Sequence, residues 1–297
     1  MQSNMPVGTI EVDALRAAPE FMSGKEMLLG NAYRPWPARI TSMRDLTSHE
    51  KLVEMRFIDE RVREAFVHEP GQFLELSLFG VGEAPISISG IGENYIDLTI
   101  RRVGRVTDEV FEHYTGQTLL LRGPYGNGFD TDLYADGETV VVAGGTGVSP
   151  VRGVIEALSC MPNAKEKYVI AGFRSPDDML FRDDLARWKD ELNLILTVDG
   201  APEGYDGNIG LVTKYIADLP LKSPEAAKAV VVGPPAMMRF TIIELQKKGF
   251  KDENITVSYE RKMCCGLGKC GHCRVNDKYI CLDGPVFNYT EGKLMMD

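Results

Sequence analysis

The sequence lacks any apolar run near the ~20 residues that a membrane-spanning helix requires. Its first residues contain neither the basic stretch nor the apolar core of a secretion signal. We therefore expect a cytoplasmic protein without membrane insertion. Basic residues are in the minority, and a net charge of −10 argues against a nucleic-acid-binding surface. The same charge permits docking to a basic or mixed protein surface.

Cysteine is scarce everywhere except in one short segment. Of the six cysteines, five lie between Cys264 and Cys281, which argues against the disulfide framework of a secreted domain. Four of them have the spacing C-x4-C-x2-C-x7-C, namely Cys265, Cys270, Cys273 and Cys281. The first three follow the plant-type ferredoxin spacing, which holds a [2Fe-2S] cluster through thiolates, while the fourth is closer than in ferredoxins. We predict that these four residues are the metal ligands.

This segment also leaves alternatives open. A structural zinc site normally has two C-x2-C pairs or a mixture of cysteine and histidine, whereas one C-x2-C pair is present here. A Rieske centre needs two histidines on one iron, and the segment contains only His272. Cys264 replaces Cys265 as the first ligand if the register slips by one residue. Cys160 lies in an apolar helical run and is predicted to be a buried thiol.

The pattern of apolar residues changes twice along the chain. Residues 1–34 show no clear period and are predicted to form an N-terminal arm, with one short helix possible around Val12–Ala18. Residues 35–135 contain evenly spaced short strand-like runs, which predict an antiparallel β-barrel. Residues 136–258 alternate strands with helices, including one expected helix over Leu211–Leu219, and predict a parallel α/β sheet. Residues 259–297 hold the cluster segment.

A glycine-rich turn follows the first strand of the α/β region. Ligands of such sheets bind at the carboxyl ends of the strands, where helix N-termini face phosphates. The stretch AGGTGVSPVR lies at this position, and Gly145, Thr146 and Gly147 are predicted to approach a pyrophosphate. Alone the turn is also consistent with a plain strand-to-helix connection, because Pro150 stands where the last glycine of a Rossmann motif would be.

Five motifs taken in order are more specific. The order APISISG, RRVGRVT, GPYGNGF, AGGTGVSP and VVGPPAMM resembles the ferredoxin–NADP reductase superfamily over nearly the whole chain after residue 35. With the cysteine segment added, the chain looks like the electron-transfer subunit of dihydroorotate dehydrogenase. It looks even more like the corresponding subunit of anaerobic sulfite reductase and the gamma subunit of cytosolic NAD(P)-linked nickel–iron hydrogenases. The resemblance implies a barrel that binds FAD, an α/β domain that binds NAD(P)H and a C-terminal iron–sulfur loop.

The resemblance also implies site residues, all of them cofactor-binding and none catalytic. The family's flavin motif R-x-Y-[ST] aligns with Ala84–Ser87, where arginine and tyrosine are absent. The residues implied to lie near the flavin are Pro85, Ser87, Arg101, Gly104, Val106, Thr107, Gly126 and Asn127. Those implied to lie near the nicotinamide nucleotide are Gly145, Thr146, Gly147, Gly233 and Pro234, with Arg174 and Asp178 near the adenosine ribose. Arg174 suits a 2′-phosphate and Asp178 a free hydroxyl, so NADH and NADPH both stay open.

These cofactors together predict an electron relay. A flavin accepts two electrons as a hydride and passes them on singly, so it can stand between NAD(P)H and an iron–sulfur cluster. We expect a subunit that feeds catalytic and ferredoxin-like partners of a redox complex, with anaerobic sulfite reductase ahead of hydrogenase. A dihydroorotate dehydrogenase partner is a further alternative. A zinc-stabilised nucleotide-binding regulatory module without redox activity is the alternative from another class.

Overall fold

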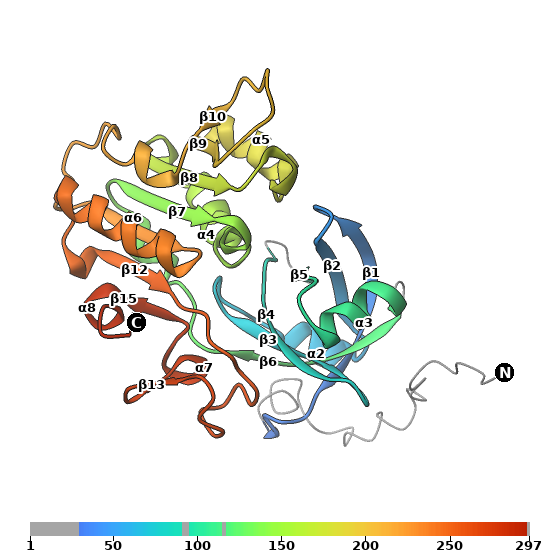
Figure 1. The fold of residues 1–297 in the computed structure, drawn as a ribbon. Helices are drawn as coiled ribbons and strands as arrows, with labels where there is room; N and C mark the ends of the chain where they lie inside the picture. Colours follow the sequence, from blue (N-terminus) through green and yellow to red (C-terminus); the bar gives the residue numbers. More distant parts are fainter. Residues whose placement is uncertain (1–29, 91–94, 115–116, 296–297) are drawn as a thin grey trace.

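The computed structural model describes residues 30–90, 95–114 and 117–295. The short helix expected around Val12–Ala18 and most of the predicted N-terminal arm lie outside these residues. In the part of the chain that the structure describes, no helix is both long and apolar enough to cross a membrane. Figure 1 shows the chain as a barrel and an α/β sheet set side by side, with the C-terminal segment running along both.

The first sheet is a six-stranded antiparallel barrel. Its strands are β1 (Trp36–Asp45), β2 (Glu50–Phe57), β3 (Phe73–Leu78), β4 (Gly82–Ser87), β5 (Ile96–Arg101) and β6 (Thr118–Tyr125), in the order β4-β3-β6-β1-β2-β5. A bridge between Ile88 and Leu98 joins the two ends of this order, so the sheet closes on itself. Alternate residues such as Leu74, Leu76 and Leu78 fill the interior. Two helices accompany the strands, α2 (Glu60–Ala65) and α3 (Arg105–His113).

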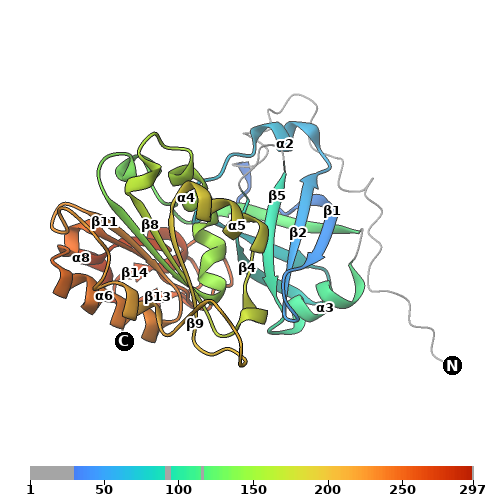
Figure 2. The ribbon, with the colours of Figure 1, turned by 90° about the horizontal axis from the view of Figure 1, so that it is seen from above.

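The second sheet is a doubly wound α/β sheet, visible beside the barrel in Figure 2. Its strands are β7 (Thr139–Gly144), β8 (Lys167–Phe173), β9 (Asn193–Val198), β10 (Asn208–Ile209), β11 (Lys228–Val232), β12 (Ile255–Ser258) and β15 (Val286–Asn288), in the order β10-β9-β8-β7-β11-β12-β15. All neighbours are parallel except β12 and β15, which are antiparallel. The expected barrel followed by a parallel-strand α/β sheet is confirmed.

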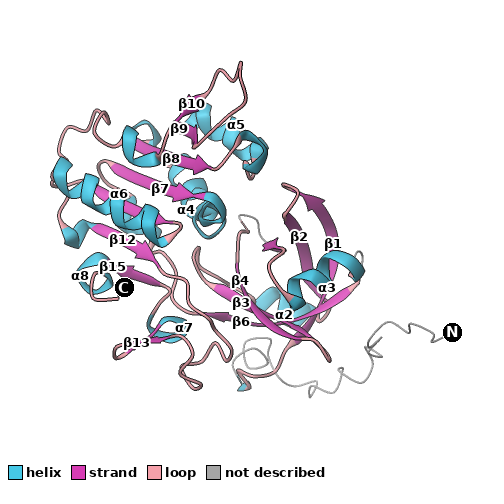
Figure 3. Ribbon diagram, in the orientation of Figure 1, coloured by secondary structure: helices cyan, strands magenta, loops and turns pink. Residues whose placement is uncertain are grey.

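Helices cover both faces of this sheet, as the colours of Figure 3 make clear. They are α4 (Val148–Ser159), α5 (Arg182–Glu191) and α6 (Pro235–Lys248). Val141 and Ala143 of β7 pack in the same core as α4 and α5, whereas Val140 and Val142 pack in the core that contains α6. This alternation explains why β7 reads as an unbroken apolar run, since both of its faces are buried.

The sequence order of the strands reverses between β7 and β11, which are neighbours in the sheet. The carboxyl ends of these two strands carry the turns that begin at Gly144 and Gly233. Such a reversal leaves a crevice between the two turns, and ligands of α/β sheets bind there. The fold therefore brings together two motifs that lie almost ninety residues apart in the sequence.

The C-terminal segment has little regular structure. It contains the two-stranded sheet of β13 (Arg274–Val275) and β14 (Lys278–Tyr279), the short helices α7 (Ile280–Asp283) and α8 (Tyr289–Gly292), and β15. Through β15 it returns to the α/β sheet, where Ser258 pairs with Val286. The division of the chain at residues 35, 136 and 259 stays a prediction.

Two expectations about single elements were wrong. The helix expected over Leu211–Leu219 is a short 3-10 turn, Val212–Tyr215, and Pro220 follows this stretch. Cys160 is exposed, because it caps the carboxyl end of α4, where the apolar face of the helix has already ended. A helical period indicates which residues face the core but is a poor guide to the residue at which the helix stops.

Candidate functional site

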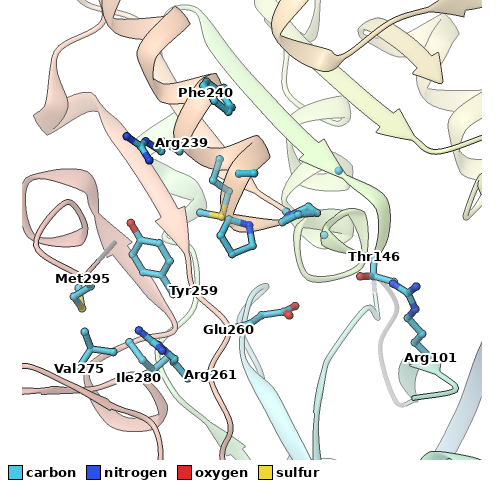
Figure 4. Close-up of a pocket in the computed structure, with 17 residues that line it drawn as sticks. Arg101, Thr146, Arg239, Phe240, Tyr259, Glu260, Arg261, Val275, Ile280 and Met295 are labelled. Atoms are coloured by element: carbon cyan, nitrogen blue, oxygen red, sulfur yellow. The ribbon is translucent and has the colours of Figure 1, made fainter. Parts of the chain in front are cut away.

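Two adjoining cavities occupy the space between the barrel and the α/β sheet. The larger, of about 690 Å³, lies at the carboxyl ends of β7 and β11, and the smaller, of about 460 Å³, lies against β4 and β5. Five residues line both cavities: Arg101, Thr146, Tyr259, Glu260 and Arg261. Figure 4 shows Thr146 and Arg101 on one side of the larger cavity, with Tyr259, Glu260 and Arg261 facing them from the other. The cavities thus meet where the two halves of the molecule meet.

The larger cavity is formed by the glycine turns of the α/β sheet. It is lined by Gly144, Thr146 and Gly147 after β7 and by Gly233 and Pro234 after β11. A methyl group added to Gly147 would lie 2.6 Å from the Val232 carbonyl oxygen, so only glycine lets these two turns approach so closely. Gly145 has a φ of 55° and open space around its α-carbon. The structure therefore brings the predicted nucleotide residues Thr146, Gly147, Gly233 and Pro234 into one cavity wall, whereas Gly145 lies outside this lining.

The smaller cavity lies between the barrel and the remainder of the chain. Its lining includes Pro85 and Ser87 from β4, Thr99 and Arg101 from β5, and Thr107 from α3. These positions include four of the residues predicted to lie near the flavin. Ser149, at the start of α4, also lines this cavity, and its buried hydroxyl has no hydrogen-bond partner among the described residues. A buried hydroxyl without a partner is costly, so a polar group of a bound ligand fits this position.

The turn that precedes α3 is held by its own side chains. The Thr107 hydroxyl accepts hydrogen bonds from the backbone N–H groups of Val103 (3.0 Å) and Gly104 (3.1 Å). Val106 lies in the first turn of the helix and packs on the barrel core. Arg101 forms an ion pair with Glu50 (3.3 Å), and its side chain is still more than half exposed toward the cavity mouth. Arg102 instead pairs with Asp108 and Glu112, away from both cavities.

Seven predicted cofactor-binding residues lie outside the lining of both cavities: Gly104, Val106, Gly126, Asn127, Gly145, Arg174 and Asp178. Arg174 and Asp178 follow β8, where the Asp178 carboxylate accepts a hydrogen bond from the Ser175 hydroxyl (2.6 Å). Asn127 binds the C-terminal segment: its amide donates to the carbonyls of Asp283 and Val286, and its carbonyl accepts from the Val286 N–H, each at 3.0 Å. Gly126 packs directly against Gly284 and Pro285. In this structure the turn that contains Gly126 and Asn127 joins the barrel to the cluster segment.

The stretch Tyr259–Arg261 was not singled out from the sequence, although all three residues line both cavities. The Tyr259 hydroxyl donates to the Gly292 carbonyl (3.0 Å), and burial raises the pKa of this phenol, so it stays protonated. Glu260 is the single carboxylate among the described residues that line either cavity. The one sequence feature that could have identified these residues is their position directly after the last parallel strand, β12.

The cysteine loop follows Arg261 after Lys262 and Met263. Met263 still lines the smaller cavity, and Cys264 and Cys265 come next. Gly266, Gly268 and Gly271 have φ values of 71°, 65° and 81°, which wrap the loop around its own sulfur atoms. Backbone N–H groups of Leu267 and Lys269 donate to Cys265 Sγ (3.4 Å each), and that of Gly268 donates to Cys281 Sγ (3.1 Å). Such amide bonds to sulfur are what a thiolate-bound metal cluster requires.

The four predicted ligand thiols lie close enough to influence one another. Cys265 affects the titration of both Cys270 and Cys281, and Cys273 affects that of Cys281 as well. Burial raises the pKa of Cys281 to about 12, whereas the backbone N–H of His272 lowers the pKa of the exposed Cys270. Within the described ranges, no three cysteine, histidine or acidic side chains converge on one point as for a single metal ion. Of the four thiols, those of Cys273 and Cys281 are buried.

Two protein-family models match parts of this chain. The family model described as "Oxidoreductase NAD-binding domain" matches residues 141–242. The model described as "Iron-sulfur cluster binding domain of dihydroorotate dehydrogenase B" matches residues 260–292. The first range contains both glycine turns, and the second contains Glu260, Arg261 and the whole cysteine loop. The chain therefore has an NAD-binding domain and an iron–sulfur-cluster-binding domain.

Relatives extend the similarity to most of the chain. The sulfhydrogenase 2 subunit gamma of Pyrococcus furiosus is 37% identical over 280 residues, covering 88% of this chain and 97% of the relative. A probable dihydroorotate dehydrogenase B electron transfer subunit of the same organism is 34% identical, covering 77% and 83%. A chain of the NADH-dependent reduced ferredoxin–NADP oxidoreductase structure, studied for flavin-based electron bifurcation, is 25% identical with a TM-score of 0.69, covering 89% and 90%. The chain belongs to the family of sulfhydrogenase gamma subunits and dihydroorotate dehydrogenase B electron-transfer subunits, within the ferredoxin–NADP reductase superfamily.

Proposed function

We propose that this chain is an electron-transfer subunit that oxidises NAD(P)H through FAD and a [2Fe-2S] cluster and passes single electrons to a partner catalytic subunit. One observation carries the proposal. The two cavities meet at Tyr259–Arg261, and from there the chain runs through Met263, which lines the smaller cavity, directly into the cysteine loop. Binding sites for a hydride donor, a flavin and a cluster are thus adjacent along one path.

The smaller cavity suits FAD. Hydroxyl groups of Ser87, Thr99, Thr107 and Ser149 line it together with the guanidinium of Arg101, which matches a ligand with a ribityl chain and phosphates. The unpartnered hydroxyl of Ser149 supports this assignment, because a bound polar group would satisfy it. The stretch Ala84–Ser87 lacks the arginine and tyrosine of the family's flavin motif. We therefore propose that Arg101 contacts the phosphates in place of the missing arginine.

The larger cavity suits the nicotinamide end of NAD(P)H. The turns at Gly145–Gly147 and Gly233–Pro234 leave room for a pyrophosphate and a ring beside Thr146. Thr146 also borders the smaller cavity, so a nicotinamide held there lies next to a flavin, as hydride transfer requires. Arg174 and Asp178 remain proposed contacts of the adenosine ribose, beyond the lining of this cavity.

The spacing of the four cysteines favours a two-iron cluster. In a [2Fe-2S] cluster with four thiolates, each iron takes two protein ligands, and the C-x4-C-x2-C spacing of Cys265, Cys270 and Cys273 is that of the plant-type cluster. A structural zinc site normally has two C-x2-C pairs or a mixture of cysteine and histidine. The amides that donate to Cys265 and Cys281 also suit sulfur atoms that carry negative charge.

A spectrum of anaerobically purified protein tests this proposal directly. Iron, zinc and flavin contents are measured with it, and NADH or NADPH is then added in separate titrations. We expect flavin and [2Fe-2S] absorption bands that bleach with at least one nucleotide, and the faster donor reveals the preference. A colourless zinc protein that ignores both nucleotides would instead support the regulatory module.

The surface around the cluster indicates the charge of the partner. Residues 261–278 contain five basic side chains and one acidic one, a net charge of +4 in a chain whose net charge is −10. Lys262 and Lys269 are exposed beside the exposed Cys270, and Leu282, next to the buried Cys281, is 58% exposed. We propose that a partner with an acidic face docks here, because complementary charge speeds association and fixes orientation.

The relatives favour a hydrogenase as the catalytic partner, since gamma subunits of sulfhydrogenases cover most of this chain. A dihydroorotate dehydrogenase partner is second, and a sulfite reductase partner stays a prediction from the resemblance of the cluster segment. Purification of the tagged protein from its own cells decides among these, since nickel, FMN or sirohaem in the co-purified subunit identifies its chemistry.

The same purification also tests the basic docking surface. The double variant Lys262→Glu/Lys269→Glu should weaken the complex at low salt, whereas Lys189→Glu, on an exposed face of α5, should not.

A further inference from the structure

The cluster loop is held from outside by one arginine of the barrel. Arg122 lies on β6, and its side chain is only 3% exposed. Its Nη1 donates to the carbonyl oxygen of Cys265 at 2.6 Å, and its Nη2 donates to that of Cys264 at 3.1 Å. The backbone of the predicted first ligand is therefore fixed by a side chain more than 140 residues earlier in the sequence.

Every N–H donor of Arg122 is used. Besides the two carbonyls, Nε and Nη2 donate to the two carboxylate oxygens of Glu83, at 2.9 and 2.6 Å, and Nη1 donates to the Tyr125 hydroxyl at 3.0 Å. These five bonds match the five donors of a guanidinium. A planar fork with all its donors engaged has one orientation, which a lysine ammonium cannot reproduce.

Both ends of this arrangement border the smaller cavity. Glu83 on β4 is followed directly by Ala84, and Cys264 is preceded directly by Met263; Ala84 and Met263 both line the cavity. Glu83 is itself held by a hydrogen bond from the Ser77 hydroxyl of β3. Arg122 thus connects the strand that borders the proposed flavin site with the first cysteine of the loop.

We propose that Arg122 is a positioning residue that sets both the place and the reduction potential of the cluster relative to the flavin. This inference rests on the proposed function, in which electrons pass from FAD to the cluster. The guanidinium holds the Cys264–Cys265 backbone against the flavin-lining strand, and electron transfer depends on that separation. Its positive charge, bonded to the carbonyl of a ligand, also favours the reduced and more negative state of the cluster.

The test compares Arg122→Met, which removes the charge and the fork, with Arg122→Lys, which keeps the charge. Arg182→Met is the matched control, because Arg182 also donates to a backbone carbonyl, that of Pro176 at 2.5 Å, but is exposed on α5 and lines neither cavity. The reduction potential of the cluster is measured by redox titration with electron paramagnetic resonance detection. The rates of flavin reduction by the nucleotide and of cluster reduction by the flavin are measured by stopped flow.

We expect Arg122→Met to lower the potential and to slow cluster reduction at least tenfold, while flavin reduction changes less than twofold. Arg122→Lys should keep most of the wild-type reduction potential, because it keeps the charge. It should not restore the rate of cluster reduction or the wild-type electron paramagnetic resonance signal of the cluster. Arg182→Met should behave as the wild type. A wild-type potential and rate in both Arg122 variants would overturn the proposal, and so would a parallel loss of flavin reduction.

Two further measurements keep the test decisive. If Arg122→Met does not retain iron, iron content becomes the readout: loss of iron with full flavin content supports the proposal, and equal loss of flavin contradicts it. Glu83→Gln, which leaves Arg122 in place but weakens its support, should slow cluster reduction less than Arg122→Met does, and loss of the Glu83 charge should raise the potential rather than lower it. The potential is read with a chemical reductant, so a wild-type cluster that nucleotide fails to reduce would refute the proposed function without affecting this result.

Discussion

Two buried arginines join the barrel to its neighbours, and they do so in different ways. Arg152 of α4 donates to the carboxylates of Asp97 (3.0 Å) and Asp184 (2.8 Å) and to the Ser89 carbonyl (2.9 Å), so it connects β5 with α5. Arg122 instead divides its bonds between one carboxylate and the backbone carbonyls of the cluster loop. Between two domains with their own cores, Arg152 reaches a carboxylate, that of Asp97, as well as one backbone carbonyl. In the cluster loop Arg122 bonds to main-chain atoms, which leaves the cysteine side chains free to bind metal.

Breaking the tie at Arg152 should have the largest effect on stability. Asp97 is only 4% exposed, and burial already raises the pKa of its carboxyl despite the opposing charge of Arg152. We expect Arg152→Met to lower the free energy of unfolding by about 3 to 5 kcal/mol, because it leaves buried carboxylates unpaired. The cluster potential should stay unchanged, in contrast to Arg122→Met.

Thermal and denaturant unfolding of the purified protein measure this loss. Arg44→Met is the control, since Arg44 pairs with Asp183 at 3.3 Å but both side chains are at least half exposed. An exposed pair contributes about 1 kcal/mol or less. Equal losses in the two variants would show that the buried tie at Arg152 has no special role.

Glu75, a buried carboxylate beside Arg122, allows a second comparison through the pH dependence of stability. It lies opposite Arg122 in the pairing of β3 with β6, is fully buried, and has no hydrogen-bond partner for either oxygen. Burial raises the pKa of Glu75 from 4.5 to about 7, against the opposing charge of Arg122. Between these two values the unfolded chain releases a proton that the folded chain retains, so stability falls as pH rises and the full loss is reached above about pH 7.

We expect this loss to be about 3 kcal/mol in the wild type between pH 4.5 and pH 8 and to be absent in Glu75→Gln. Unfolding of both proteins at several pH values across this range measures it. The quantity to compare is the difference between the two proteins, because other groups titrate equally in both. A difference that does not change with pH would contradict the raised pKa.

The smallest effect is expected at Tyr125. Its hydroxyl accepts a bond from Arg122 and donates to the Ala32 carbonyl, while the guanidinium keeps its other four bonds without it. Tyr125→Phe should therefore cost about 1 kcal/mol of stability and leave the cluster potential nearly unchanged. Thermal unfolding and the same redox titration measure the two quantities. A potential shift as large as that of Arg122→Met would mean that the hydroxyl, rather than the guanidinium, governs the cluster.

The parts of the fold that sequence predicted well are those with local patterns. Alternation in the barrel strands, apolar runs such as β7, and the spacing of Cys265, Cys270 and Cys273 are each contained in a short stretch of chain. The two glycine turns were also recognised separately. That they share one cavity follows from the strand order, in which β7 and β11 are neighbours.

The contacts around the cluster could not be predicted in this way. Arg122 stands in a run that simply reads as a strand, and its partners lie 39 and more than 140 positions away. Asn127 was assigned to the flavin through resemblance, whereas its side chain bonds to Asp283 and Val286. Glu75 is an acidic residue in a strand in which every residue is buried, and only the sheet order shows that Arg122 lies opposite. Long-range pairs of this kind leave no periodic signal.

The pairing of Ser258 with Val286 also bears on how the cluster is assembled and repaired. The cysteine loop leaves the α/β sheet at the end of β12 and returns to the neighbouring position as β15, so its two ends are fixed side by side. Bringing the free ends of a flexible loop together costs conformational entropy. Here the pairing of β12 with β15 already holds the two ends together. We therefore expect a chain without its cluster to keep both ends of the cysteine segment at the same edge of the sheet, which shortens the search for the ligand geometry when a cluster is inserted.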